Sequence, residues 1–258
     1  MSDLLTERHD SVFVVTFNRI DKHNAFDDTV LNALQASLID AIADPAIRVI
    51  MLKAHGKHFS AGADLAWMQC MANYSEQENF SDAMILARVM NTLYECPKPT
   101  IAVVQGATFG GGIGLIAACD IAIASNAAQF CFSEVKLGLI PAVISPYVIK
   151  AIGERAAKWL FMSGEVFIAE QAKHLQLIHY TVDETDLWPF ALNYAQKLTS
   201  LPPNAVLDCK SLVNQVSHQP ITEELVKKTA TLIAKKRVST EGQKGLTAFL
   251  NKQNVNWS

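Results

Sequence analysis

The chain has 258 residues, half of them hydrophobic, and a formal net charge of −3, so it can bury a sizeable core in one large domain or in a domain with an appendage. It has no basic block, which makes nucleic acid a poor default partner. Because no apolar run approaches the ~20 residues that span a bilayer and the N-terminus lacks a signal-type apolar core, we expect a cytoplasmic protein with no membrane partner.

The first part of the chain alternates predicted strands and helices, which is typical of the α/β class. Short β-branched or apolar runs predict strands at 11–17, 46–54, 100–104, 120–124 and 128–132. Helical spacing of apolar residues predicts helices at 27–43 and 76–95 and the start of another at 64–71. The glycines at 110–112 open a short helix that is apolar on every side and therefore buried.

After Pro146 the strand signals nearly vanish, apart from residues 179–183. Helices are predicted at 153–162, 169–176, 187–199, 204–217 and 222–237. We divide the chain into a core at 1–195 and a C-terminal helical region at 196–258. Because this region cannot bury its apolar faces alone, we expect it to pack on a neighbouring subunit.

The cysteines indicate a reducing compartment. The chain has five of them, an odd number, and none pair as CxxC. Reduced, packed thiols explain this pattern better than a disulfide framework or a zinc site, so we predict no bound metal.

The stretch from Gly112 to Ala117 reads GxGxxA, and Glu134 follows it at a distance that suits a dinucleotide-binding fingerprint. In such a site the glycine turn begins where the strand ends. Here residues 105–111 separate the predicted strand at 100–104 from Gly112. We therefore predict no nicotinamide or flavin site.

Two loop-to-helix junctions, at 60–64 and 109–112, place small residues before apolar helices. Such junctions could aim two backbone N–H groups at one oxygen and so form an oxyanion hole for a carbonyl that becomes an enolate. Close-packing glycine turns explain the same pattern. Residues 58–62 resemble the nucleophile elbow of serine hydrolases, but His58 stands in place of its first glycine, and we interpret His55 and His58 as solvated loop residues.

Seven stretches of the chain together resemble the crotonase (enoyl-CoA hydratase/isomerase) superfamily. In the family's order they are residues 23–26, 59–65, 98–112, 119–125, 132–141, 151–157 and 245–249. The resemblance implies a spiral of ββα turns with a C-terminal helical region that builds homotrimers, often paired into hexamers. It also implies a coenzyme A thioester as substrate and no separate cofactor.

The resemblance also implies the roles of individual residues. Ala63 and Gly111 match the family's two oxyanion-hole N–H donors, and Glu134 matches a catalytic glutamate. Lys22 could meet a phosphate of the coenzyme. Further positions that the resemblance assigns to the substrate or its coenzyme are His23, Ala25, Ala61, Asp64, Leu65, Gly110, Ser133, Phe249 and Lys252.

One position departs from the family pattern. Hydratases of this family usually carry two glutamates around one water, but Gly114 stands where the first would be. Residues 111–120 together with 133–148 look most like the bacterial methylglutaconyl-CoA hydratases of leucine degradation and their relatives in acyclic terpene breakdown, whose substrates carry their own carboxylate. We hypothesise that Gly114 removes a repelling charge and opens room, with Ser133, Ser145 and Tyr147 lining that end of the pocket.

The resemblance thus predicts a lyase that hydrates a 2-enoyl-CoA, with 3-methylglutaconyl-CoA giving 3-hydroxy-3-methylglutaryl-CoA as the leading reaction. A lone carboxylate can also move a double bond, so an enoyl-CoA isomerase is an alternative, as is a general enoyl-CoA hydratase. A catalytically silent oligomer that binds acyl-CoA is the alternative that is not an enzyme.

Overall fold

The computed structural model describes residues 2–257, and the chain divides into two compact units, residues 1–195 and 196–258. A six-stranded sheet forms the centre of the first unit, with the strand order β1-β2-β3-β4-β6-β9. In this sheet β1 and β2 pair in antiparallel fashion, and all other neighbours are parallel. The strands are β1 (Leu4–His9), β2 (Val12–Phe17), β3 (Val49–Ala54), β4 (Thr100–Val104), β6 (Ile121–Ser125) and β9 (Tyr180–Val182).

A second, three-stranded sheet has the order β5-β7-β8. β5 (Ala107–Phe109) runs parallel to β7 (Gln129–Cys131), and β8 (Val166–Ile168) pairs with β7 in antiparallel fashion. Phe109 pairs with Cys131, so the glycine turn after β5 lies close to the chain that leaves β7.

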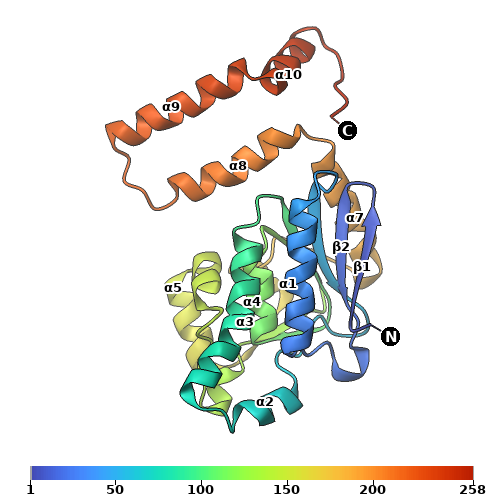
Figure 1. Cartoon of the computed structure of the whole chain (residues 1–258), viewed down its shortest axis with the longest axis vertical. Helices are drawn as coiled ribbons and strands as arrows, with labels where there is room; N and C mark the ends of the chain where they lie inside the picture. Colours follow the sequence, from blue (N-terminus) through green and yellow to red (C-terminus); the bar gives the residue numbers. More distant parts are fainter. Residues whose placement is uncertain (1, 258) are drawn as a thin grey trace. The chain divides into compact units, whose positions relative to one another are not determined.

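The helices of the first unit cover the sheets (Figure 1). They are α1 (Asp28–Ala43), α2 (Leu65–Met71), α3 (Glu76–Tyr94), α4 (Gly111–Ala118), α5 (Ser145–Ser163), α6 (Ala169–His174) and α7 (Glu184–Thr199), with the short 3₁₀ helices η1 (Ile20–Lys22) and η2 (Glu134–Leu137). α1 begins at the side chain of Asp27, which accepts a hydrogen bond from the Val30 N–H. Its fully buried Leu31, Leu34 and Leu38 recur at helical spacing, so one face packs into the core.

The glycine-rich helix α4 lies inside the first unit. It contacts α3 and α5, and six of its eight residues are buried. A helix that is apolar on every side is stable only where other elements surround it, which confirms the sequence prediction for this segment.

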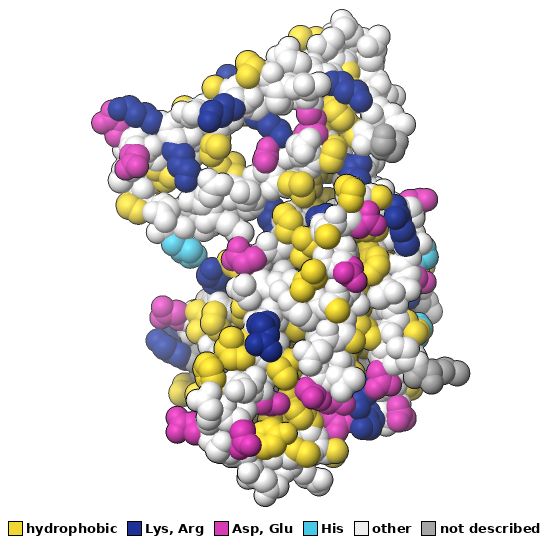
Figure 2. Space-filling view, viewed as in Figure 1, with side chains coloured by type: hydrophobic (Ala, Val, Ile, Leu, Met, Phe, Trp, Pro, Cys, Tyr) yellow, Lys and Arg dark blue, Asp and Glu magenta, His cyan; other side chains and the backbone are white. Residues whose placement is uncertain are grey.

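The second unit contains α8 (Pro203–Val216), α9 (Glu223–Val238) and α10 (Thr240–Leu250). Lys236 Nζ on α9 lies 2.6 Å from Asp208 Oδ2 on α8, and Glu241 of α10 accepts a hydrogen bond of 2.7 Å from the Ala205 N–H. α8 and α9 have no buried residue, and hydrophobic side chains reach the surface over these helices (Figure 2).

The α/β class is confirmed, and most predicted elements occur within a few residues of their expected ends. Three strands and one α-helix were not predicted, namely β1, β5, β8 and α10, and neither were the short 3₁₀ helices η1 and η2. β1 is an edge strand whose middle residues are exposed, while β5 and β8 have three residues each, too few to show a period. α5 is broken at Gly153, which has a non-helical conformation (φ 77°), so the helix predicted at 153–162 corresponds to the part after the break, and the part that begins at Ser145 was not predicted.

Candidate active site

The segment 60–64 lies between the loop at 23–26 and the strand β5. The Phe26 N–H donates to Gly62 O (2.9 Å) and the Asp64 N–H donates to Phe26 O (3.0 Å), which makes a parallel bridge between Phe26 and Ala63. In such a bridge the bonds to Phe26 come from residues 62 and 64, so the N–H of Ala63 points away from it. Within residues 2–257 that N–H donates no hydrogen bond.

The glycine turn presents a second open N–H. Gly110 precedes α4 with φ 50°, and no side chain caps the helix. The Gly110 N–H donates to Cys131 O (3.0 Å), and Gly110 O accepts from the Ile113 N–H (2.9 Å). The first N–H groups of a helix have no partner within it, and the Gly111 N–H donates to no acceptor in the described chain.

The two junctions touch each other through their backbones. A Cβ added at Gly62, which has φ 92°, would lie 3.1 Å from Phe109 O. A Cβ added at Gly111 would lie 2.8 Å from Phe26 Cζ. Gly62 therefore requires glycine, and a side chain at Gly111 would have to displace the ring of Phe26. The Phe109 N–H donates to Ser60 O (3.0 Å), so the Ala63 and Gly111 N–H groups belong to segments in direct contact.

Glu134 lies beside the glycine turn, as the first residue of η2. A Cβ added at Gly110 would lie 3.2 Å from Glu134 Oε1. The other carboxylate oxygen, Oε2, is buried and has no hydrogen-bond partner among the described residues. Burial raises the pKa of Glu134, opposed by a hydrogen bond from its own backbone. A buried carboxylate with a raised pKa beside open N–H groups is typical of a general acid or base.

The expectation that Gly114 opens room is wrong. A Cβ added there would lie 2.2 Å from Ile144 Cγ2 and 2.9 Å from Met90 Cε, and Ile144 and Met90 are themselves buried. The side chains of Ile144 and Met90 therefore fill the space that a carboxylate side chain at position 114 would need. Sequence alone could not show this, because α3 and the residues before α5 supply those side chains.

The loop at 23–26 is held by a buried amide. Asn24 Nδ2 donates to His55 O (2.8 Å) and His58 O (2.7 Å). The expectation that His58 is a solvated loop residue is wrong, because its Nδ1 accepts a hydrogen bond of 3.0 Å from the Ala107 N–H and burial lowers its pKa. The ring of His23 lies 5.2 Å from that of His58, so His23 stands on a fixed loop.

Asp64 is only 4% exposed, and its carboxylate makes several bonds within the protein. Its Oδ1 accepts from the Ala66 N–H (2.8 Å), and its Oδ2 lies 2.8 Å from Lys22 Nζ and 3.2 Å from Arg19. The hydrogen bond from Lys22 lowers the pKa of Asp64 most strongly. The ammonium of Lys22 is thus engaged by Asp64, and its contact with a coenzyme phosphate stays a prediction.

The other predicted positions differ in exposure. Ser145 Oγ donates to Ala142 O (2.8 Å), and the ring of Tyr147 lies 5.5 Å from that of Tyr94. Among the positions assigned to the substrate or coenzyme, Ala25 and Gly110 are buried, Ser133 is half-buried, and Ala61, Leu65, Phe249 and Lys252 are exposed. Phe249 and Lys252 lie in the second unit, and their roles stay predictions.

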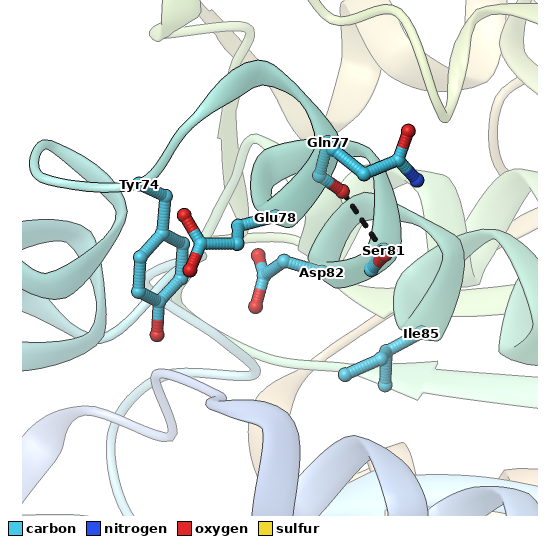
Figure 3. A pocket seen from close by; sticks show the side chains of 6 residues that line it. All are labelled: Tyr74, Gln77, Glu78, Ser81, Asp82 and Ile85. Atoms are coloured by element: carbon cyan, nitrogen blue, oxygen red, sulfur yellow. Dashed lines mark hydrogen bonds between the residues drawn. The ribbon is translucent and has the colours of Figure 1, made fainter.

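A pocket of about 410 Å³ lies at the start of α3 (Figure 3) and is not evident from the sequence. Trp67 Nε1 on α2 donates to Asp82 Oδ1 (2.9 Å) and so joins the two helices, while burial raises the pKa of Asp82. The residues that line the pocket are Tyr74, Gln77, Glu78, Ser81, Asp82 and Ile85. This lining contains two carboxylates and no cation, and none of the predicted catalytic residues.

Metal-binding clusters and membrane-spanning helices are both absent from residues 2–257. No group of three or more His, Cys, Asp and Glu side chains there could hold a metal ion. No helix in the described chain has both the length and the apolarity needed to cross a membrane.

Known proteins resemble this chain over its whole length. Residues 7–258 match the enoyl-CoA hydratase/isomerase family. A solved structure from Legionella pneumophila, assigned as an enoyl-CoA hydratase/isomerase (crotonase), is 59% identical, covers 100% of both chains and has a TM-score of 0.98. An enoyl-CoA hydratase from Shewanella pealeana is 43% identical over 99% of this chain and 96% of its own, with a TM-score of 0.94. The 2,3-dehydroadipyl-CoA hydratase of Escherichia coli is 29% identical over 98% of this chain and 97% of its own.

Proposed function

Because the chain belongs to the enoyl-CoA hydratase/isomerase (crotonase) family, we propose that it is a hydro-lyase that adds water to a 2-enoyl-CoA thioester. One observation carries the proposal: Oε2 of Glu134, which is buried and has no hydrogen-bond partner within residues 2–257, lies beside the open end of α4. The relative from Shewanella pealeana is named an enoyl-CoA hydratase, and that from Escherichia coli is named a 2,3-dehydroadipyl-CoA hydratase; both match nearly the whole chain.

In the proposed mechanism, the thioester oxygen accepts hydrogen bonds from the Ala63 and Gly111 N–H groups. These bonds strengthen as negative charge develops on that oxygen in an enolate, and removing one such donor from other enzymes costs ~3–4 kcal/mol. The donors are backbone groups of fixed loops, so they need no reorganisation during the reaction.

Glu134 is the proposed acid and base. Its carboxylate takes a proton from water as the water oxygen bonds to the β-carbon, and it returns a proton to the α-carbon as the enolate collapses. The double bond is consumed, and no net charge changes. Burial raises the pKa of Glu134, which brings its two protonation states closer in energy near neutral pH and suits a group that must act in both directions.

We propose 3-methylglutaconyl-CoA as the substrate, converted to 3-hydroxy-3-methylglutaryl-CoA in leucine degradation. The resemblance of residues 111–120 together with 133–148 to methylglutaconyl-CoA hydratases supports this choice. The apolar wall of Ile144 and Met90 at Gly114 supports it too, because a second carboxylate there would repel a substrate that carries its own. The Escherichia coli relative is likewise named for a dicarboxylic acyl-CoA.

The test is a panel of enoyl-CoA thioesters with and without a distal carboxylate, assayed in ¹⁸O-labelled water with product mass as the readout. We expect uptake of one labelled oxygen, with the highest kcat/KM for 3-methylglutaconyl-CoA. If kcat/KM for crotonyl-CoA equals that for 3-methylglutaconyl-CoA, the proposed substrate is wrong and the protein is a general enoyl-CoA hydratase.

A single-carboxylate isomerase is the second candidate. The apolar surroundings of Gly114 favour it, because Ile144 and Met90 leave no room there for a second catalytic carboxylate. An isomerase would move the double bond with no gain in product mass, so the same experiment distinguishes the two reactions. A silent acyl-CoA-binding oligomer would bind the thioesters and return each of them unchanged.

We propose further that the chain forms homotrimers or hexamers in the cytoplasm. The exposed apolar side chains of the second unit, such as Val213, Ile221 and Val238, support self-association. The exposed free thiols of Cys70 and Cys209 fit a reducing compartment. Analytical ultracentrifugation of the full chain tests the assembly: a monomer at micromolar concentration would contradict it.

A further inference from the structure

Ser60 lies between the two loops that carry the open N–H groups, and it is fully buried (0% exposed). Its backbone bridges to Thr108 of β5: the Ser60 N–H donates to Ala107 O (3.4 Å), and Ser60 O accepts from the Phe109 N–H (3.0 Å). The residue is therefore fixed to the strand that leads directly into the glycine turn.

The side chain of Ser60 faces both junctions. Its Oγ accepts a hydrogen bond of 3.1 Å from the Gly62 N–H, and Gly62 is the residue before Ala63. A Cβ added at Gly112 would lie 3.0 Å from Ser60 Cβ and 3.1 Å from Thr108 Cγ2. Ser60 thus packs against the first turn of α4, one residue beyond Gly111.

We propose that Ser60 is a positioning residue that sets the separation and direction of the Ala63 and Gly111 N–H donors, an inference that rests on the proposed function. The side chain of Ser60 contacts Gly62 and Gly112, which are the residues next to the two donors. Its loss should therefore change the direction of both N–H groups. Without the Ser60 hydroxyl, the buried Gly62 N–H would have no acceptor. The loop that ends at Ala63 would then change conformation to give this N–H a new partner.

The surroundings of Ser60 exclude a role as nucleophile. The residue has no exposed surface, and Nδ1 of His58, two residues away, is already occupied by the Ala107 N–H. A serine nucleophile needs a base within hydrogen-bond reach and access to substrate. The serine-hydrolase interpretation of residues 58–62 therefore fails on geometry, and the hydroxyl acts through the backbone.

Ser125 offers a matched control. It is equally buried (1% exposed), and its Oγ accepts from the N–H two residues on, that of Ala127 (3.2 Å), in the same local pattern as Ser60 and Gly62. Ser125 ends β6 and touches neither junction. Ser125→Ala therefore reproduces the loss of a buried serine–backbone bond without changing the donors.

The first measurement compares Ser60→Ala with Ser125→Ala in the full chain. We expect both variants to lose similar thermal stability. Only Ser60→Ala should lower kcat, by ~10- to 100-fold, with KM changed less than about threefold, because misaimed groups slow the reaction more than they weaken binding. Equal kcat values in the two variants would overturn the proposal.

The second measurement uses acetoacetyl-CoA, whose enolate carries negative charge on the thioester side and absorbs in the near ultraviolet. We expect the pH at which the bound enolate appears to rise by about one unit or more in Ser60→Ala relative to Ser125→Ala, since each tenfold loss in enolate stabilisation equals one pH unit. Enolate that appears at the same pH in both variants overturns the role of Ser60, whereas a wild-type protein that forms none overturns the proposed function itself.

Ser60→Cys keeps the proposal testable if Ser60→Ala fails to fold. Sulfur is a weak acceptor of nearly the same shape, so this variant should fold and show the same changes in kcat and in enolate pH, to a smaller extent. A folded Ser60→Cys protein with wild-type values of both would contradict the inference.

Discussion

The two helices that begin near the candidate site differ in how their first N–H groups are satisfied. At α2 the carboxylate of Asp64 accepts from Ala66 and Trp67, and none of the helix's residues is buried. At α4 no side chain caps the helix, although it is largely buried. Because the positive end of a helix attracts negative charge, the protein neutralises one end with its own carboxylate and leaves the other for a ligand.

This difference separates a structural carboxylate from a reactive one. Asp64 has a lowered pKa because Lys22 bonds to it, while Glu134 has a raised pKa because burial outweighs its one backbone hydrogen bond. Both acids lie near the start of a helix, but only Glu134 has a carboxylate oxygen, Oε2, that is buried without a hydrogen-bond partner among the described residues, which suits its proposed role as acid and base. Substitution of Glu134 should therefore lower mainly kcat, whereas substitution of Asp64 should lower mainly the free energy of unfolding.

The largest effect is expected for Glu134→Gln. It removes the proposed acid and base but keeps the shape of the side chain, so kcat should fall by ~10²- to 10⁴-fold while acyl-CoA binding survives. Steady-state kinetics and equilibrium binding check this, with the exposed Glu165→Gln as control. A Glu134→Gln protein that kept half the wild-type kcat would remove Glu134 from the mechanism.

The same substitution should change how stability depends on pH. A folded-state pKa above the unfolded value means that the fold favours the protonated acid, so its contribution is full below the unfolded pKa and is lost as pH rises through the folded pKa. Glutamine does not titrate. Urea denaturation should therefore show Glu134→Gln to be more stable than wild type at neutral pH, with the difference vanishing in acid.

A smaller effect, on stability rather than chemistry, is expected for Asp64→Ala. The variant loses a helix cap, worth ~1 kcal/mol, and takes one carboxylate from the buried guanidinium of Arg19, so the free energy of unfolding should fall by about 3 kcal/mol in total. Because the pKa of Asp64 is lowered, this stabilisation is present above its unfolded pKa and is lost as pH falls through the folded pKa.

Ser75→Ala separates the contribution of the helix cap from that of the ion pairs in the stability lost by Asp64→Ala. Ser75 caps α3 through a capping box but has no buried ion pair, so its loss should be near 1 kcal/mol and should depend little on pH. If denaturation gives Asp64→Ala the same loss as Ser75→Ala, the ion pairs of Asp64 contribute nothing.

Gly114→Ala should cost ~1–3 kcal/mol, because the new methyl meets Ile144 and Met90. In an Ile144→Ala background the cost should shrink, and a double-mutant cycle measures the difference as a coupling free energy. Additive losses would mean that Ile144 does not occupy the space beside Gly114.

The smallest effect is expected for Thr108→Val, and it has the opposite sign. Thr108 Oγ1 is buried and has no hydrogen-bond partner among the described residues. Valine keeps the branched shape without the hydroxyl, so the free energy of unfolding should rise by up to ~1 kcal/mol. A loss above about 1 kcal/mol in chemical denaturation would indicate a partner for the hydroxyl in solution.

The sequence alone predicts the elements that have a clear pattern of apolar residues. The helix predicted at 76–95, observed at Glu76–Tyr94, follows from its apolar spacing, and the strand at 100–104 follows from a short apolar run. The buried character of α4 also follows from its composition. β5 could not be found this way, and neither could the role of Ser60, because both depend on pairing between distant segments.

The candidate site shows the same limit. The resemblance singled out Glu134, and the structure adds that its Oε2 is buried without a partner among the described residues. The gap at Gly114 was visible in the sequence, but the side chains that close it come from other parts of the chain. The sequence shows that position 114 lacks a glutamate. Whether the space beside it is empty or filled depends on the packing of other segments, which the sequence does not show.

The bridges that pair Phe26 with Ala63 and Ser60 with Thr108 have a consequence for the folding pathway. They join segments that are far apart in the chain, and closing long loops is entropically costly until other contacts hold the ends together. α4 cannot form early on its own, because a short helix is unstable in water. During refolding, secondary structure should therefore return before activity, and a partly folded chain with most of its helices would lack the proposed oxyanion hole.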